Sequence, residues 1–142
     1  MSSFIRGLAL CVLTAVVAAG CVSSPAAPSN NGVFSSVDLS IGTGASAQNG
    51  QSLTVNYTGW LYDTTQPGDK GAVFDASGAT PFTFTLGSTG VIAGWNQGLV
   101  GIQIGGVRRI VIPPSLAYGA KRTGSIPENA TLLFEVQLVS IG

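Results

Sequence analysis

The side chains that could do chemistry in this sequence are acidic and aromatic, because the commonest catalytic type is missing. Of its 142 residues none is histidine and only two are cysteine. The absence of histidine and the presence of only two cysteines exclude a zinc site and a Ser-His-Asp triad. What remains is Asp75 next to Phe74, Tyr118 before Gly119, and Trp95 within an apolar segment. Whatever the protein does, it must do with few charges and several aromatic rings.

Charge excludes a second class of function. Six Lys and Arg residues balance six Asp and Glu residues, and charged residues make up only 8% of the chain. No basic patch is available to bind nucleic acid. The pairs Arg108-Arg109 and Lys121-Arg122 are interpreted as solvated surface, and Gly42-Thr43-Gly44 as a turn, not a phosphate-binding loop. We therefore expect no nucleic-acid partner, no metal and no cofactor.

Trp95 lies on one face of a predicted helix. Ile92, Trp95 and Leu99 follow the spacing i, i+3, i+7 within residues 91–104, which places them on a single helical face. A tryptophan on such a face is most often a core residue. Taken alone, Trp95 would be interpreted in this way, as Trp60 is.

The elements that must position these residues are mostly short strands. Twenty glycines and seven prolines separate stretches in which apolar and polar residues alternate. The polar segment 63–72 contains Pro67-Gly68 and is predicted to be a loop. A sheet with one apolar face would wrap the helix, which gives an α+β domain. The predicted strands are 37–41, 52–58, 73–75, 81–86, 107–112 and 131–139.

The first 20 residues have the pattern of a secretory signal. Arg6 precedes a twelve-residue apolar run, residues 8–19, and small residues follow it. The run is too short to span a bilayer as a mature helix, which takes roughly 20 apolar residues. A buried core helix is the alternative. The low-complexity segment 22–32 argues against it, because a core helix rarely leads into such a segment.

Cys21 is predicted to carry a lipid. Ala18-Ala19-Gly20-Cys21 resembles the lipobox of bacterial lipoproteins, with Ala where Leu is commoner. Ordinary signal cleavage nearby would instead leave Cys21 as a free thiol. The predicted organisation is a signal peptide at 1–20, a lipidated cysteine and flexible linker at 21–34, and one domain at 35–142. We expect an exported, membrane-anchored monomer without disulfides.

Six segments of the domain carry a family resemblance: Tyr57-Thr58-Gly59, Phe74-Asp75, residues 81–87, residues 91–95, residues 117–120, and Ile126-Pro127 leading to residues 130–136. In their order and nearly in their spacing they resemble the FKBP-type peptidyl-prolyl cis-trans isomerases. The similarity runs from about residue 37 to 138. It implies an FKBP-like fold with about five antiparallel strands around one short helix. It also implies proline-containing polypeptide substrates and macrolide immunosuppressant inhibitors.

The resemblance also implies a pocket and roles for its residues. Trp95 would form the floor. Asp75, Tyr118, Tyr57 and the backbone N–H of Ile92 would take part in catalysis. The implied substrate-binding residues are Phe74, Phe82, Val91, Trp95, Ile126 and Phe134.

The sequence departs from better-known members around the implied rim. Residues 76–81 form a short loop without the arginine that often neighbours the aspartate. Residues 118–126 are also short and lack a histidine, Glu128 replaces a common proline, and 63–72 is an insertion. These changes bear on substrate preference and rate. Three roles remain open for Asp75, which could orient Tyr57, polarise the rotating amide or serve only the structure.

The sequence thus predicts an isomerase that assists the folding of exported proteins. The alternative is a binding module or chaperone that holds proline-containing segments with little turnover. A third possibility is a surface lipoprotein with a vestigial site.

Overall fold

The computed structural model describes residues 32–142. The predicted signal peptide, Cys21 and the linker up to residue 31 lie outside the described residues. Within residues 32–142, no helix is both long and apolar enough to cross a membrane.

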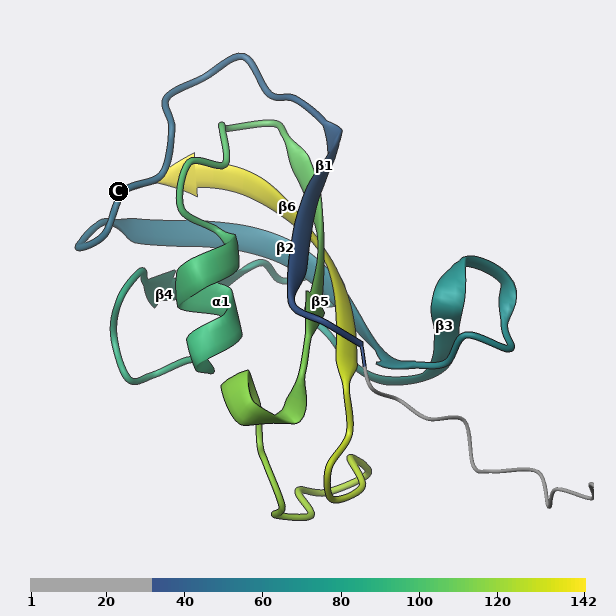
Figure 1. Ribbon diagram of the computed structural model, residues 1–142. Helices are drawn as coiled ribbons and strands as arrows, with labels where there is room; N and C mark the ends of the chain where they lie inside the picture. The colour runs from purple at the N-terminus through teal and green to yellow at the C-terminus, as the bar shows by residue number, and fades with distance from the viewer. Residues whose placement is uncertain (1–31) are drawn as a thin grey trace, which may run out of the picture.

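One antiparallel sheet of six strands makes up most of the domain (Figure 1). The strand order is β1-β5-β6-β2-β3, and β4 pairs with β2 beside this path. The predicted α+β class is confirmed, and the sheet has six strands, the number predicted from the alternation, where the family resemblance implied about five. The strands are β1 (Ser35–Ser40), β2 (Ser52–Tyr62), β3 (Lys70–Ala76), β4 (Phe82–Thr85), β5 (Val107–Ile112) and β6 (Leu132–Ile141).

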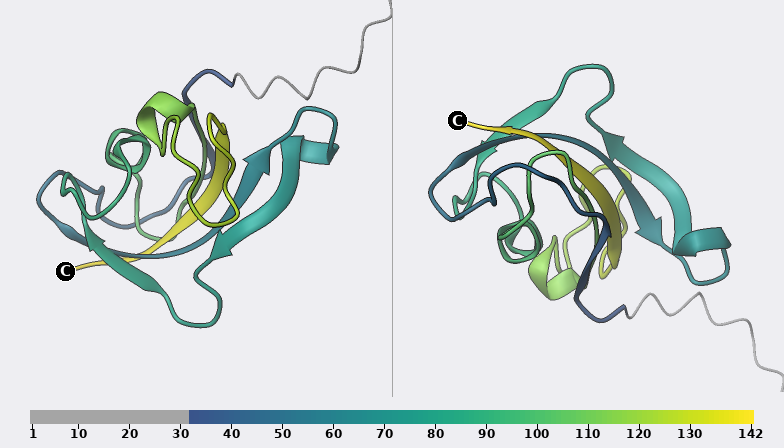
Figure 2. Two further views of the ribbon diagram at one scale, coloured as in Figure 1. Left: turned by 90° about the horizontal axis from the view of Figure 1, so that it is seen from below. Right: turned by 90° about the horizontal axis from the view of Figure 1, so that it is seen from above.

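The sheet curves around the helix α1 (Ala93–Gly98), as both views of Figure 2 show. Alternate residues of β5 and β6 point to the helix and form the core, among them Ile110, Ile112, Leu132, Phe134 and Val136. Burying these side chains is the main driving force for folding.

The helix is shorter than the apolar periodicity of residues 91–104 suggested. Its last residue is Gly98, and Leu99 caps it. Gly101 then takes a positive φ of 86°, a conformation that glycine adopts easily and that ends the helical path. Ile102 still reaches the core beyond this turn and is 1% exposed.

Strand β2 is shared by two partners on one edge. Its first half pairs with β4 and its second half with β3, while β6 pairs along the other edge. The connection from β3 to β4 passes beside Tyr57 of β2. There the Ser77 N–H donates to the Tyr57 carbonyl at 3.0 Å, and the Ser77 hydroxyl accepts from the Tyr57 N–H at 3.0 Å. Strands β3 and β4 are thereby placed on either side of Tyr57.

Part of the polar insertion is strand. Residues 63–72 were predicted to be a loop, but β3 begins at Lys70, after the 3₁₀ turn η1 (Pro67–Asp69). Lys70 pairs with Glu135 at 2.8 Å, and its ammonium lies 4.5 Å from the centre of the Trp60 ring. Asp69 pairs with Arg109 at 3.0 Å. These contacts hold the β2–β3 hairpin to the outer face of the sheet.

Candidate active site

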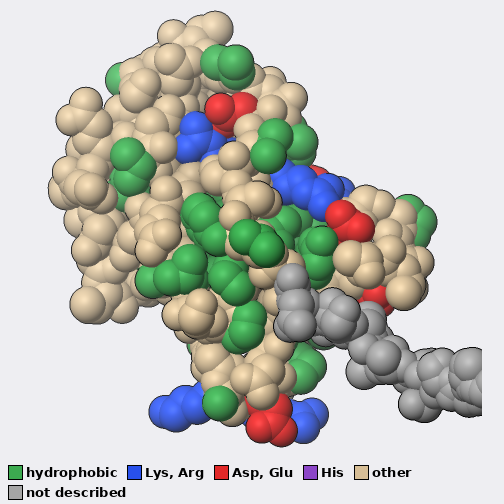
Figure 3. Space-filling model, viewed as in Figure 1, with side chains coloured by type: hydrophobic (Ala, Val, Ile, Leu, Met, Phe, Trp, Pro, Cys, Tyr) green, Lys and Arg blue, Asp and Glu red, His purple; other side chains and the backbone are tan. Residues whose placement is uncertain are grey.

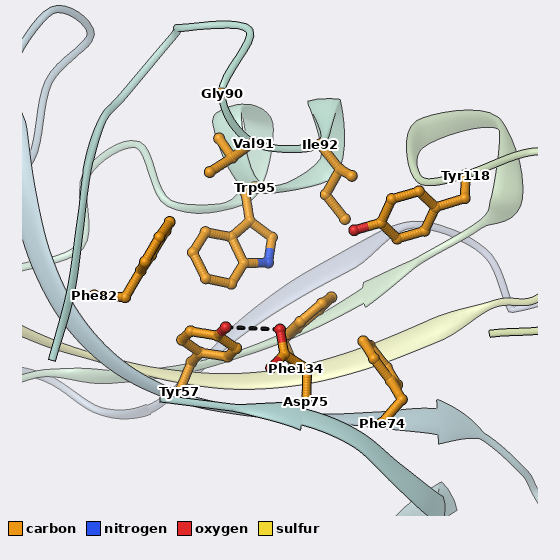
Figure 4. Close-up of a pocket in the computed structure, with 10 residues that line it drawn as sticks. All are labelled: Tyr57, Phe74, Asp75, Phe82, Gly90, Val91, Ile92, Trp95, Tyr118 and Phe134. Atoms are coloured by element: carbon orange, nitrogen blue, oxygen red, sulfur yellow. Dashed lines mark hydrogen bonds between the residues drawn. The ribbon is translucent and has the colours of Figure 1, made fainter. Parts of the chain in front are cut away.

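A pocket lies between α1 and the strands β2, β3, β4 and β6 (Figure 4). Its walls come from segments far apart in the sequence, which meet because β2 runs through the middle of the sheet. The lining residues are Tyr57, Phe74, Asp75, Phe82, Gly90, Val91, Ile92, Trp95, Tyr118 and Phe134.

Trp95 lies at the bottom of the pocket and is 4% exposed. Aromatic rings surround its indole edge-on, with centroids 5.0 Å away for Tyr57 and 5.3 Å away for both Phe84 and Phe134. Edge-to-face contacts of this kind add to the stability gained from burial. The indole is therefore held in one orientation. Its buried Nε1–H has no hydrogen-bond partner among residues 32–142.

A β-bulge brings two consecutive residues of β3 into the pocket. Gly59 pairs with Asp75, but Trp60 pairs with Val73, so Phe74 is the extra residue. In a regular strand Phe74 and Asp75 would face opposite sides of the sheet. Gly59 itself leaves room for this arrangement, since a Cβ there would lie 2.8 Å from the rings of both Phe74 and Phe134.

Asp75 is hydrogen-bonded on both carboxylate oxygens. The Tyr57 hydroxyl donates to Oδ2 at 2.7 Å, and the Ala76 N–H donates to Oδ1 at 2.9 Å. The contact with Tyr57 is the one that an orienting role would require. Figure 4 shows this hydrogen bond close to the indole of Trp95.

Both tyrosines of the site are held in the protonated form. Burial raises the pKa of Tyr57 well above its usual range, and the hydrogen bond to Asp75 and the negative charge of that carboxylate raise it further. Burial also raises the pKa of Tyr118, and the charge of Asp75 adds to the effect. At neutral pH both tyrosine hydroxyl groups are therefore neutral.

The structure gathers the predicted site residues except Ile126. That side chain is 5% exposed, belongs to the core and is not among the lining residues. Two hydrogen bonds with Thr123, at 2.8 and 3.0 Å, hold Ile126 in a tight turn. Gly90 lines the pocket and was not predicted. Its position directly before Val91-Ile92 was the available signal.

Comparison with known proteins agrees with this geometry. The family model for FKBP-type peptidyl-prolyl cis-trans isomerases matches residues 44–139. The chain belongs to this family. The match includes every residue that lines the pocket.

The matches to individual FKBP relatives cover different shares of the relatives' own lengths. An FK506-binding protein of Neisseria meningitidis serogroup B is 43% identical over 107 residues, covering 73% of this chain and 92% of the relative. FK506-binding protein 4 of Dictyostelium discoideum is 46% identical over 106 residues, covering 72% of this chain but 27% of the relative. This chain spans about a quarter or less of the FK506-binding protein 4 relatives it matches.

A solved structure shows the same FKBP fold. The crystal structure of AtFKBP13 superposes with a TM-score of 0.67 at 32% identity, covering 77% of this chain and 93% of the other. The expected FKBP-like fold is confirmed.

Alkaline solution should destabilise this FKBP domain through Tyr57. Its pKa is raised in the folded state and stays near 10 in the unfolded state, so the folded state holds the proton more tightly. The resulting stabilisation is fully present below about pH 10 and is lost as the pH rises through the folded-state pKa.

Denaturant unfolding of wild type and Tyr57→Phe between pH 8 and 11 measures this contribution. Other groups titrate in the same range, so the difference between the two proteins is the quantity of interest. The wild type should lose more stability with rising pH than the variant. Parallel pH profiles would contradict the assignment.

Proposed function

We propose that this protein is a peptidyl-prolyl cis-trans isomerase that acts on proline-containing polypeptides. The observation that carries the proposal is the pocket itself, in which a fixed indole forms an apolar floor beneath a rim of hydroxyl groups. Membership of the FKBP-type family supports it.

The chemistry needs no nucleophile. A peptide bond resists rotation because amide resonance is lost as the bond twists, with a barrier of about 18–20 kcal/mol. A catalyst must favour the twisted state over both planar ones. Water stabilises the charge-separated resonance form of a planar amide. An aromatic pocket that removes this water therefore favours the twisted form, which has less charge separation.

The predicted residues that line the pocket then have proposed roles. The indole of Trp95 holds the proline ring while the acyl part rotates, and Phe74, Phe82, Val91 and Phe134 exclude water around it. Tyr118 is 38% exposed at the rim, and its hydroxyl and the Ile92 N–H anchor neighbouring carbonyl groups of the substrate.

Asp75 acts through Tyr57 in this proposal. The Tyr57 hydroxyl donates to Asp75 at 2.7 Å, which fixes the position of the tyrosine at the pocket, while burial, this hydrogen bond and the charge of Asp75 together raise the pKa of Tyr57. The contact favours the orienting role among the three considered. A carboxylate held by two donors is also well placed to keep a fixed position.

Exchange NMR on a short Xaa-Pro peptide tests the activity without a coupling protease. Catalytic amounts of the protein should accelerate cis-trans exchange, and FK506 should inhibit it, because relatives of this chain are named FK506-binding proteins. Binding of FK506 without acceleration would favour the binding module or chaperone. Neither binding nor acceleration would favour a vestigial site.

We further propose that the isomerase is an exported lipoprotein that assists the folding of exported proteins as a monomer. The support is the sequence of residues 1–21, with its apolar run and lipobox-like end. Palmitate labelling of cells producing wild type or Cys21→Ser protein tests the anchor. Label should enter the wild type alone. An unlabelled wild type whose Cys21 reacts with a thiol reagent would instead indicate ordinary signal cleavage.

A further inference from the structure

The charged residues of the domain are mostly paired with one another. Three ion pairs join Lys70 to Glu135, Arg108 to Asp38 and Arg109 to Asp69. Figure 3 shows positive and negative side chains lying together in small groups around an uncharged, partly hydrophobic centre. Most charges on this face are therefore compensated locally.

Asp75 is an exception at the exposed rim of the site. Within residues 32–142, no Lys or Arg nitrogen lies within the 4.0 Å of an ion pair from its carboxylate. Its two hydrogen-bond donors, the Tyr57 hydroxyl and the Ala76 N–H, carry no charge. Hydrogen bonds of this kind fix the carboxylate but leave its full negative charge at the rim.

We propose that Asp75 makes the isomerase prefer substrates with a positively charged side chain adjacent to the proline. This inference rests on the proposed function. The α-carbons next to a proline lie only about 2.9–3.8 Å from its own, so a neighbouring side chain leaves the pocket across the rim. Lysine and arginine can bury their apolar stems there and extend the charge towards Asp75.

The apolar lining strengthens this effect. A charge pair beside low-dielectric walls interacts more strongly than the same pair in bulk water. Residues 32–142 hold five Lys and Arg residues and six Asp and Glu residues, a formal net charge of only −1, so attraction of basic peptides to the domain as a whole contributes little to a preference. A preference must therefore come from the local charge.

Exchange NMR on two matched peptide series tests the inference. In one series Lys, Gln or Glu precedes the proline, and in the other it follows. For at least one series we expect kcat/KM to be roughly fivefold higher for Lys than for Glu at low ionic strength, with Gln between them. The ratio should shrink towards about one in 1 M salt, where the Debye length is about 3 Å.

Two Asp→Asn variants isolate the residue responsible. Asp75→Asn keeps an oxygen that can accept from Tyr57 while removing the charge, so the Lys-to-Glu ratio should fall to about one, whatever happens to absolute activity. Asp63→Asn makes the same change in net charge at a site held by Thr65 in the β2–β3 hairpin. It should retain the wild-type ratio.

The outcomes separate this inference from the proposed function. Acceleration of the Gln peptides with equal turnover of Lys and Glu peptides in both series would overturn the charge preference and leave the isomerase intact. A preference that persists in Asp75→Asn would also overturn it. Failure to accelerate any peptide would overturn the proposed function itself.

Discussion

Replacing Trp95 with alanine is expected to lower the free energy of unfolding by about 3–5 kcal/mol, the usual cost of truncating a large aromatic side chain in a core. Isomerase activity should fall to background in whatever fraction remains folded. Both effects come from one side chain. Trp95 is 4% exposed and contacts four other aromatic rings, and its indole is also the pocket floor.

Denaturant unfolding and exchange NMR measure the two effects separately. Because domains of this size are stable by only about 5–15 kcal/mol, the variant should be assayed at low temperature with its folded fraction known. Trp95→Phe retains an apolar ring and should lose less stability than the alanine variant. Loss of activity in folded Trp95→Phe would show that the shape of the indole matters beyond its bulk.

Trp60→Ala is the matched control. Trp60 is only partly buried, lies on the outer face of the sheet beneath the Lys70 ammonium, and does not line the pocket. We expect a smaller loss of stability and near-normal activity in its folded fraction. Full activity in folded Trp95→Ala would contradict the placement of the site.

Trp95 also shows why single residues were hard to assign from the sequence. Helical periodicity predicted its place on a buried face, and the structure agrees, since Trp95 belongs to the core. A role in the site followed only from the companion segments of the FKBP family. Core and pocket are not alternatives here, because the floor of the pocket is the upper surface of the core.

The bulge in β3 could not be predicted from the alternation of apolar and polar residues. Period two places Phe74 and Asp75 on opposite faces, yet the register shift between Gly59 and Trp60 turns both to the pocket. The beginning of β3 was missed for a related reason. Lys70 is polar because it pairs with Glu135 on an outer face of the sheet, where no apolar signal is required.

Ile126 and Gly90 differ from the prediction because each depends on local chain geometry. Ile126 is apolar and close in sequence to other site segments, but its turn with Thr123 directs it to the core. Gly90 has no side chain to suggest a function, and it enters the pocket only because the chain passes there before α1. Neither position could be derived from residue type alone.

Replacing Gly94 with alanine is expected to destabilise the domain by about 2 kcal/mol, because it overpacks the contact between α1 and β5. A Cβ at this position would overlap Cγ2 of Ile112 and lie 2.7 Å from its Cδ1, and the Ile112 side chain is fully buried. Alanine gains up to about 1 kcal/mol in helix propensity over glycine, so the steric cost must exceed this gain. Because Trp95 is the next residue, the shift should also reduce isomerase activity.

A double-mutant cycle with Ile112→Ala tests the cause. The smaller side chain removes the atoms that the new methyl group would meet, so Gly94→Ala should cost at least about 1 kcal/mol less in that background. Gly90→Ala is the control for stability, since a Cβ there has only the Ser88 hydroxyl nearby, at an ordinary 3.5 Å. Additive effects of Gly94→Ala and Ile112→Ala would mean that the helix does not depend on this close approach to hold the indole in place.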